Sequence, residues 1–365
     1  MIEGSDKKNG MPACRMIRAA DVFCGVGGLT RGLEDAGIDV AVGIDIDPAC
    51  EYPYNQNNNA TFRLKSVENI EASDLRDAFG DVDFRLLAGC APCQTFSTYN
   101  QKADVSDERW WLLRHFSRLV REIKPEFVTM ENVPGLENHE VFEEFLNDLE
   151  CSGYYVDYGV VSCEEYGIPQ FRKRLVLLAS RLGKIKLLTP EQFGAERKTV
   201  RKAIGGLRPI GAGEVDQEDP LHQSCVLSDL NMKRMKASRP GGTWREWPKE
   251  LVAQCHRSES GKTYPCVYGR MKWDAPSPTL TTQFYGFGNG RFGHPEQDRA
   301  ISLREGAVLQ TFPNDYKFVA PGKMIKKKAL GRLIGNAVPV KLGEVVGKSF
   351  LCHIASLTQN QSESI

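Results

Sequence analysis

The 365-residue chain lacks several features that would set it apart from ordinary globular proteins. No apolar run approaches the roughly 20 residues that a transmembrane helix needs, and the opening MIEGSDKKNGMPACR contains no signal-peptide core. Eleven cysteines, an odd number scattered along the chain, do not form the framework of a disulfide-rich secreted protein. We therefore expect a reduced, cytoplasmic protein with no membrane partner.

The chain also has no formal net charge, because 47 Lys and Arg residues balance 47 Asp and Glu residues. The charges are nevertheless unevenly distributed along the sequence. Residues 171–210 contain eleven Lys and Arg but only two acids, Glu191 and Glu196. Further basic residues follow in 233–249. Such a segment is compatible with a solvated surface, but it also suggests one face for a polyanion such as a nucleic acid.

A glycine-rich turn near the start of the chain predicts a nucleotide-binding unit. The run 17–23 is typical of a buried strand, 24–28 (CGVGG) of a turn, and 29–34 of a helix. Such glycines let the backbone approach a ligand closely. The next predicted strand, 40–44, ends in Asp45, about 20 residues after the turn, where related folds hold ribose hydroxyls. Because the turn is FCGVGG rather than G-x-G-x-x-G, it favours S-adenosylmethionine over a dinucleotide.

The stretch GCAPCQTFS at 89–97 places Cys93 in a turn directly after the predicted strand 84–88. Open α/β sheets carry their chemistry at the carboxyl ends of strands, so this thiol is a candidate nucleophile. Two alternatives remain open here. Cys93 could be a buried structural cysteine, or it could form a redox or zinc C-x-x-C pair with Cys90. The polar, aperiodic segment 98–108 that follows is suited to an active-site lid.

Two further stretches carry polar side chains suited to an active site. The predicted strand 127–130 is followed by Glu131, which is either a general acid at the same sheet edge as Cys93 or an ordinary surface acid. Arg172 and Arg174 alternate along an extended segment, so they are expected to point to one side and form a paired clamp for an anion or a carbonyl.

Composition divides the chain into a larger and a smaller unit. From 185 to 273 long periodic helices are scarce, whereas Gly, Pro, Trp and basic residues are frequent. We expect this segment to be a separate domain. The main α/β domain would then comprise 15–184 and 274–356, with polar tails at 1–14 and 357–365.

The C-terminal part of the chain contains two predicted helices. RAISLREGAVLQTFP at 299–313 predicts a helix that begins at Ser302 and ends at Pro313. GNAVP at 335–339 precedes a final helix over about 340–354. No metal site is expected, because the scattered His and Cys residues of the smaller domain match no standard zinc spacing. These residues are His222, Cys225, Cys255, His256 and Cys266.

Taken in order, these blocks resemble the DNA cytosine-5 methyltransferases, the family typified by bacterial restriction-modification enzymes. The resemblance covers nearly the whole chain outside the tails and 185–273. It rests on DVFCGVGGLTRGLE, GIDIDPA, APCQTFS, MENVPGL, QFRKR and, near the end, RAISLREGAVLQTFP with GNAVP. It implies an α/β, Rossmann-like, S-adenosylmethionine-dependent catalytic domain, and it makes 185–273 a smaller, mixed, loop-rich target-recognition domain.

The resemblance also implies roles for individual residues. Cys93 would add to carbon 6 of a flipped cytosine, protonated Glu131 would hydrogen-bond near N3, and Arg174 would hold the O2 carbonyl. Arg172 would support the active-site loop or a phosphate. The implied cofactor residues are Phe23, Gly25, Gly27, Gly28, Leu29, Asp45, Ile46, Val67, Asn336 and Val338. The candidate DNA contacts are Gln94, Ser97, Arg197, Lys198, Arg201, Lys202 and Arg239.

Two positions depart from the family's pattern. Asp45 replaces a glutamate that is common there, which gives a shorter arm for the same contact. Ser66 and Val67 stand where many members have an aspartate for the adenine amino group, so the adenine contact is expected to differ.

The implied partner is double-stranded DNA, bound by a monomer associated with the nucleoid, and a cognate restriction endonuclease would act separately. Two rival interpretations remain. A tRNA-modifying branch shares the catalytic core, but its Cys-Phe-Thr signature is absent from this sequence. A catalytically inactive DNA-binding relative would be expected to have lost Cys93, Glu131 or the cofactor glycines, and all of them are present.

Overall fold

A seven-stranded sheet organises the computed structural model, which describes residues 16–92, 111–259 and 261–362. Its strand order is β3-β2-β1-β4-β5-β8-β6. The first five strands of that order run parallel, and β8 is antiparallel to both of its neighbours. The strands are β1 (Ile17–Val22), β2 (Asp39–Asp45), β3 (Thr61–Leu64), β4 (Phe84–Gly89), β5 (Phe127–Asn132), β6 (Tyr155–Ser162) and β8 (Lys173–Ser180). The expected α/β class is confirmed.

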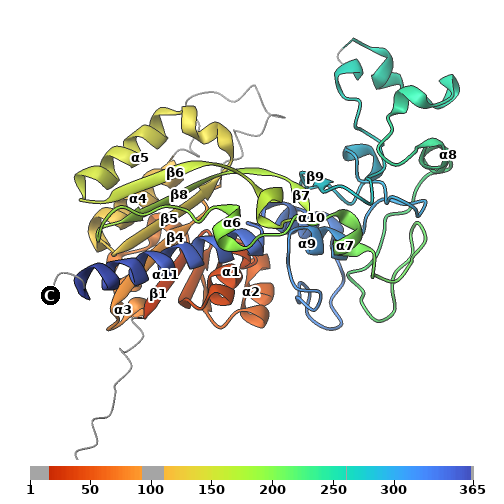
Figure 1. Cartoon of the computed structure of the whole chain (residues 1–365). Helices are drawn as coiled ribbons and strands as arrows, with labels where there is room; N and C mark the ends of the chain where they lie inside the picture. The colour runs from red at the N-terminus through yellow and green to blue at the C-terminus, as the bar shows by residue number, and fades with distance from the viewer. Residues whose placement is uncertain (1–15, 93–110, 260, 363–365) are drawn as a thin grey trace, which may run out of the picture.

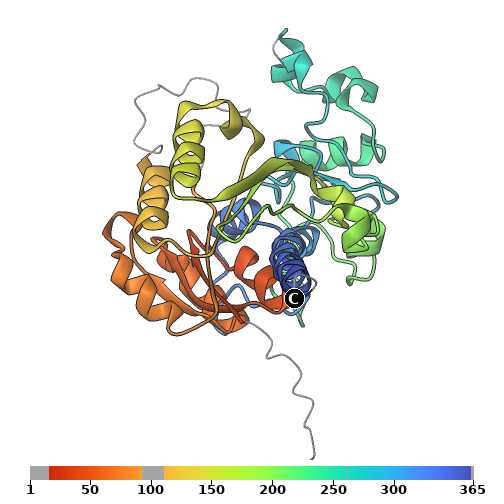
Figure 2. The same ribbon diagram turned by 60° about the vertical axis from the view of Figure 1, so that its left-hand side comes forward.

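Helices cover both faces of the sheet, which explains why its central strands are apolar on both sides. One face packs against α3 (Ala72–Phe79), α4 (Trp111–Ile123) and α5 (Glu140–Cys151). The other packs against α1 (Gly28–Ala36) and the long α11 (Val340–Ser362). Figures 1 and 2 show α11 lying along the sheet beside α1, so the first and the last α-helix of the described chain share one layer.

Glycines allow α1 and α11 to pack this closely. A Cβ at Gly32 would lie 2.2 Å from the carbonyl oxygen of Val340, and one at Gly343 would lie 2.8 Å from that of Leu29. Backbone atoms cannot retreat from such a contact as a flexible side chain can. The C-terminal helix is therefore fixed directly against the helix that follows the glycine turn.

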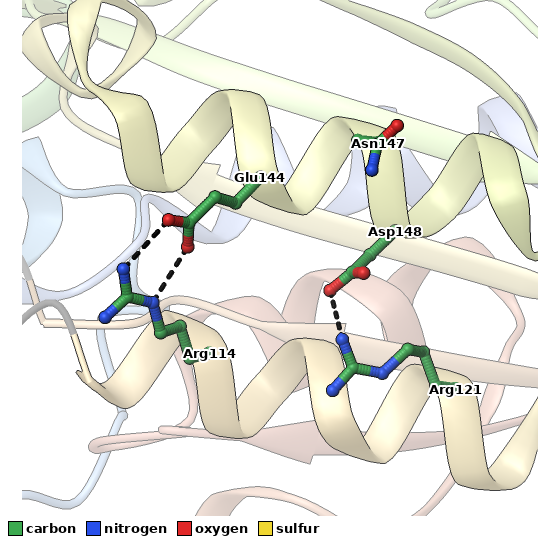
Figure 3. A pocket seen from close by; sticks show the side chains of 5 residues that line it. All are labelled: Arg114, Arg121, Glu144, Asn147 and Asp148. Atoms are coloured by element: carbon green, nitrogen blue, oxygen red, sulfur yellow. Dashed lines mark hydrogen bonds and ion pairs between the residues drawn. The ribbon is translucent and has the colours of Figure 1, made fainter.

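Charged side chains join α4 to α5 on the opposite face (Figure 3). Arg114 makes a two-bond contact with Glu144, at 2.8 and 2.9 Å, and Arg121 Nη1 lies 2.5 Å from Asp148 Oδ2. These residues and Asn147 line a groove. Since its charges are paired within the protein, we assign this groove to helix packing rather than to chemistry.

The C-terminal helices agree only partly with the sequence prediction. Helix α9 (Leu303–Leu309) begins after Ser302 as expected, because the Ser302 hydroxyl accepts the backbone N–H of Glu305. It ends before Pro313, since Thr311 adopts a positive φ of 64°. Helix α11 continues to Ser362, beyond the predicted end near 354. Helix α10 (Lys327–Asn336) was not predicted.

The chain that follows α7 (Val200–Ile204) extends to one side of the sheet and forms a loop-rich lobe in both ribbon views (Figures 1 and 2). Aromatic packing organises its outer part: Trp244 stacks on His256 with ring centroids 4.5 Å apart, and Tyr268 packs edge-on against Trp247. Its longest helix is α8 (Asp229–Ala237). The domain boundaries at 185 and 273 stay a prediction.

A short parallel pairing connects this lobe to the main sheet. Strand β7 (Gln170–Phe171) pairs with β9 (Ser277–Pro278) just before β8 begins. None of the helices in the described ranges is both long and apolar enough to cross a membrane.

Candidate active site

The turn between β1 and α1 wraps over the carboxyl ends of β1 and β2. The backbone N–H groups of Phe23 and Cys24 donate to the carbonyl of Ile44, at 2.8 and 3.2 Å. Phe23, Gly25 and Gly27 have positive φ angles of 65°, 53° and 88°, a region that glycine adopts freely and phenylalanine does not. A Cβ on Gly25 would meet nothing within 4 Å, so the space beside this turn is open.

Asp45, at the end of β2, is tied to this turn through its carboxylate. Its Oδ2 accepts the backbone N–H of Gly25 and its Oδ1 that of Asp47, both at 2.9 Å. Burial raises the pKa of Asp45, while these backbone hydrogen bonds oppose the shift. The next side chain, Ile46, is 70% exposed, so apolar surface lies beside the carboxylate.

The structure brings the far end of the chain to the same turn. A Cβ on Gly28 would lie 2.2 Å from the carbonyl oxygen of Val338, so the GNAVP segment contacts the first turn of α1. Asn336 is exposed at the end of α10, whereas Val338 is buried. Leu29 and Val67 are also buried, in the apolar layers on opposite faces of the sheet, and their contact with a cofactor stays a prediction.

Asp21 is a polar residue in β1 that the sequence prediction missed. It is fully buried, its Oδ2 accepts the hydroxyl of Thr30 at 2.7 Å, and its Oδ1 has no hydrogen-bond partner among the described atoms. Burial raises the pKa of Asp21 to about 7. An acid between apolar residues near the end of the first strand, four residues before Gly25, was the available signal.

A second group of polar side chains lies where β5 ends. Glu131 is 5% exposed, and its Oε1 forms an ion pair with Arg174 Nε at 2.8 Å. The thiol of Cys90 donates to Glu131 Oε2 at 2.8 Å. Asn132 Nδ2 donates to the carbonyl of Ala91 at 3.1 Å. Glu131 is therefore not a surface acid, and the end of β5 holds the turn that leads to Cys93.

Arg172 and Arg174 do not form the expected paired clamp, because the guanidinium groups have different partners. Arg174 contacts Glu131, whereas Arg172 is 2% exposed and donates to backbone carbonyls, including that of Leu280 at 3.3 Å and that of Gly335 at 3.2 Å. The strand register breaks between β7 and β8 at this residue, so simple alternation fails. Arg172 is buried and joins distant segments of the backbone.

Three predicted residues lie outside the described part of the chain. These are Cys93, Gln94 and Ser97, together with the proposed lid at 98–108. The first described range ends at Pro92, one residue before the candidate nucleophile, and the next begins at residue 111.

Comparison with known proteins decides the family. Residues 17–352 match the model of the C-5 cytosine-specific DNA methylases. The chain belongs to this family. It is therefore a DNA (cytosine-5-)-methyltransferase, as the order of its sequence blocks predicted. The Type II methylase M.HgiDII of Herpetosiphon aurantiacus is 49% identical to this methyltransferase over 344 residues, which cover 93% of this chain and 97% of the relative.

Other relatives agree with this assignment. The Type II methyltransferase M1.BsuMI of Bacillus subtilis is 32% identical over 89% of this chain and 78% of its own length. A crystal structure of a prophage-encoded DNA modification methyltransferase from E. coli superposes with a TM-score of 0.71 at 22% identity, covering 93% of this chain and 99% of that one. The S. pombe Dnmt2 methyltransferase gives a TM-score of 0.60 at 20% identity, covering 94% and 99%. These likenesses confirm the expected methyltransferase fold.

The basic residues predicted to contact DNA lie on the surface of the methyltransferase, but several already have acidic partners. Arg201 pairs with Asp274 at 2.9 Å, and Arg239 Nη2 lies 2.9 Å from Glu246. Arg197 is 73% exposed and lies 3.8 Å from Glu165. Lys198 and Lys202 are exposed. Exposed pairs of this kind are weak, so they can exchange for phosphate contacts.

The histidines of the smaller lobe have structural partners in the described chain. His222 Nδ1 lies 2.8 Å from the Ser302 hydroxyl and its Nε2 lies 2.7 Å from the carbonyl of Arg208. His256 stacks on Trp244. Within the described ranges no group of three His, Cys, Asp or Glu side chains is placed to hold a metal ion.

Proposed function

We propose that this methyltransferase uses S-adenosylmethionine to methylate carbon 5 of a flipped cytosine within a short, specific sequence of duplex DNA. The observation that carries the proposal is the Cys90–Glu131–Arg174 group at the end of β5, beside the turn that leads to Cys93. It supplies an acid and a cation to the sheet edge that also carries the glycine turn.

The residues around the glycine turn fit the proposed cofactor. Open space beside Gly25 admits a ligand close to the backbone. Each oxygen of Asp45 accepts one backbone N–H and retains a further lone pair for a ribose hydroxyl. Exposed Ile46 offers apolar surface for the adenine ring. S-adenosylmethionine would supply the activated methyl group, with Phe23, Gly27 and the Asn336–Val338 segment completing the pocket.

We propose Cys93 as the nucleophile that adds to carbon 6 of cytosine. Carbon 5 is a poor nucleophile, and thiolate addition at carbon 6 converts the ring to an enamine in which carbon 5 can accept a methyl group. Loss of the carbon-5 proton and elimination of the thiolate then release 5-methylcytosine. The neighbouring Cys90 is unsuited to this role, because burial raises the pKa of its thiol and its hydrogen points at Glu131.

Glu131 and Arg174 would stabilise the ring as addition proceeds. Negative charge develops on the ring when the thiolate adds. A protonated Glu131 can hydrogen-bond near N3 and the amino group, while the Arg174 guanidinium can hold the O2 carbonyl. Since the two side chains already lie 2.8 Å apart, both could reach the edge of one base. Arg172 would act indirectly, by holding the 280 and 335–337 segments in place.

The reacting atoms of cytosine are inaccessible inside a duplex, so the base must be flipped out, which costs a few kcal/mol. Closure of the 94–108 segment over the flipped base, with Gln94 and Ser97 contacting DNA, would offset that cost. Sequence recognition is assigned to the 185–273 segment, through base-edge contacts, while its basic residues hold phosphates. The Type II names of the relatives favour a restriction-modification setting. There a monomer in the cytoplasm, associated with the nucleoid, would act separately from its cognate endonuclease.

Expression in a bacterial host lacking cytosine methylation, followed by bisulfite sequencing of the genome, tests this function. We expect full methylation of one cytosine within one short motif. Transplanting residues 185–273 into a related catalytic core should transfer that motif. Unmodified genomic cytosines together with new 5-methylcytosine in tRNA would refute the DNA assignment.

A further inference from the structure

Cys90 is the first residue after β4, and it links three neighbouring strand ends. Its backbone N–H donates to the carbonyl of Val22, the last residue of β1, at 3.3 Å. Its thiol donates to Glu131 Oε2, in β5, at 2.8 Å. The side chain is half-buried, at the point where the chain turns toward Cys93. A cysteine that only filled the core would not need a carboxylate partner.

The carboxylate of Glu131 is held from both sides. Arg174 Nε lies 2.8 Å from Oε1, and the Cys90 thiol occupies Oε2. Directly beside it, Asn132 Nδ2 donates to the carbonyl of Ala91. Two consecutive side chains of β5 therefore contact two consecutive residues of the 90–91 turn. Any shift of that turn changes where the carboxylate points.

We propose that Cys90 is a positioning residue, whose thiol orients the carboxyl group of Glu131 relative to the turn that carries the nucleophile. This inference rests on the proposed function, in which Glu131 contacts the flipped cytosine. Cys90 itself touches neither the base nor the cofactor. It acts through Glu131.

A thiol suits this position because it is a neutral donor that keeps its hydrogen. Burial raises the pKa of Cys90, and the nearby negative charge of Glu131 adds to the shift, so the group stays protonated. Alanine at this position would remove the thiol donor to Oε2, and within the described ranges no other hydrogen bond would hold that oxygen. Serine would retain a donor on a similar side chain. Valine would fill the space without donating.

The experiment compares the full-length wild-type enzyme with Cys90→Ala, Cys90→Val and Cys90→Ser. Single-turnover methylation rates are measured at saturating S-adenosylmethionine and DNA containing the recognised motif, and KM values for both are determined separately. Cys163→Ala is the matched control, because Cys163 is buried and lies next to the Arg172–Arg174 segment, where its backbone N–H donates to the carbonyl of Arg172 at 2.8 Å. Thermal unfolding of each variant checks that it is folded.

We expect Cys90→Ala and Cys90→Val to lower the single-turnover rate about ten-fold or more, with KM values little changed, because the hydrogen bond that orients the Glu131 carboxyl group is lost. Cys90→Ser should recover most of the rate, and Cys163→Ala should resemble wild type. A valine variant as fast as the serine variant would reduce Cys90 to packing and overturn the proposal. An active wild type with unaffected Cys90 variants refutes only this inference. A wild type that makes no 5-methylcytosine refutes the proposed function instead.

Discussion

Replacing Asp45 should weaken S-adenosylmethionine binding without unfolding the protein. Its carboxylate accepts backbone N–H groups from Gly25 and Asp47, both at 2.9 Å, and its remaining lone pairs are assigned to the ribose. Losing a charge-assisted hydrogen bond costs about 1.5–3 kcal/mol, which corresponds to a ten- to hundred-fold larger dissociation constant. Calorimetric titration of Asp45→Ala with S-adenosylmethionine measures this directly.

Two further variants separate charge from shape at this position. Asp45→Glu keeps the carboxylate and should bind within a few-fold of wild type. Asp45→Asn should be at least as weak as alanine, because its amide group would face a backbone N–H donor. Asp39→Ala is the control, since this acid begins the same strand and pairs with Arg18 at the surface. An unaltered dissociation constant in Asp45→Ala, or an equal loss in Asp39→Ala, would show that the ribose assignment is wrong.

Two other predictions concern the same sheet edge. Gly28→Ala should destabilise the fold by about 1–3 kcal/mol and weaken cofactor binding, because its Cβ would lie 2.2 Å from the Val338 carbonyl oxygen. Thermal unfolding measures the loss of stability. Gly206→Ala is the control and should have no effect, because a Cβ there would lie in open space. Burial raises the pKa of Asp21 to about 7, so its contribution to stability is present below pH 4 and lost as pH rises to 7, by up to about 1.4 kcal/mol per pH unit. Urea unfolding should therefore show that Asp21→Asn gains stability relative to wild type between pH 5 and pH 7, and a constant difference would contradict the assignment.

The sequence predicted the catalytic half of the fold well, because its signals are local. Apolar runs that end in glycine, Asp45 or Glu131 are typical of buried parallel strands, and each of these strands is present. Serine is a preferred N-cap residue, and Ser302 correctly predicted the start of α9. The end of that helix depends on a backbone angle at Thr311, which no residue preference reveals.

The contacts between distant segments could not be predicted in the same way. Arg172 belongs to a basic motif, yet its partners are carbonyls more than a hundred residues away, near Leu280 and Gly335. Alternation along a strand predicted that Arg172 and Arg174 point to the same side. That prediction was wrong, because the break between β7 and β8 is not visible in the sequence. The Cys90–Glu131 contact also joins residues that are distant in the sequence. It shows that the first cysteine of the C-x-x-C pair donates a hydrogen bond to a carboxylate.

The most direct test of the catalytic mechanism is covalent trapping on DNA that carries 5-fluorocytosine at the methylated position. Fluorine cannot be eliminated as a proton is, so the intermediate should accumulate in the presence of S-adenosylmethionine. We predict a protein–DNA adduct whose cross-linked peptide contains the modified Cys93. Cys90→Ser should still form this adduct, and Cys93→Ser should form none. An adduct that persists in Cys93→Ser, or one mapped to Cys90, would contradict the central claim that Cys93 is the nucleophile.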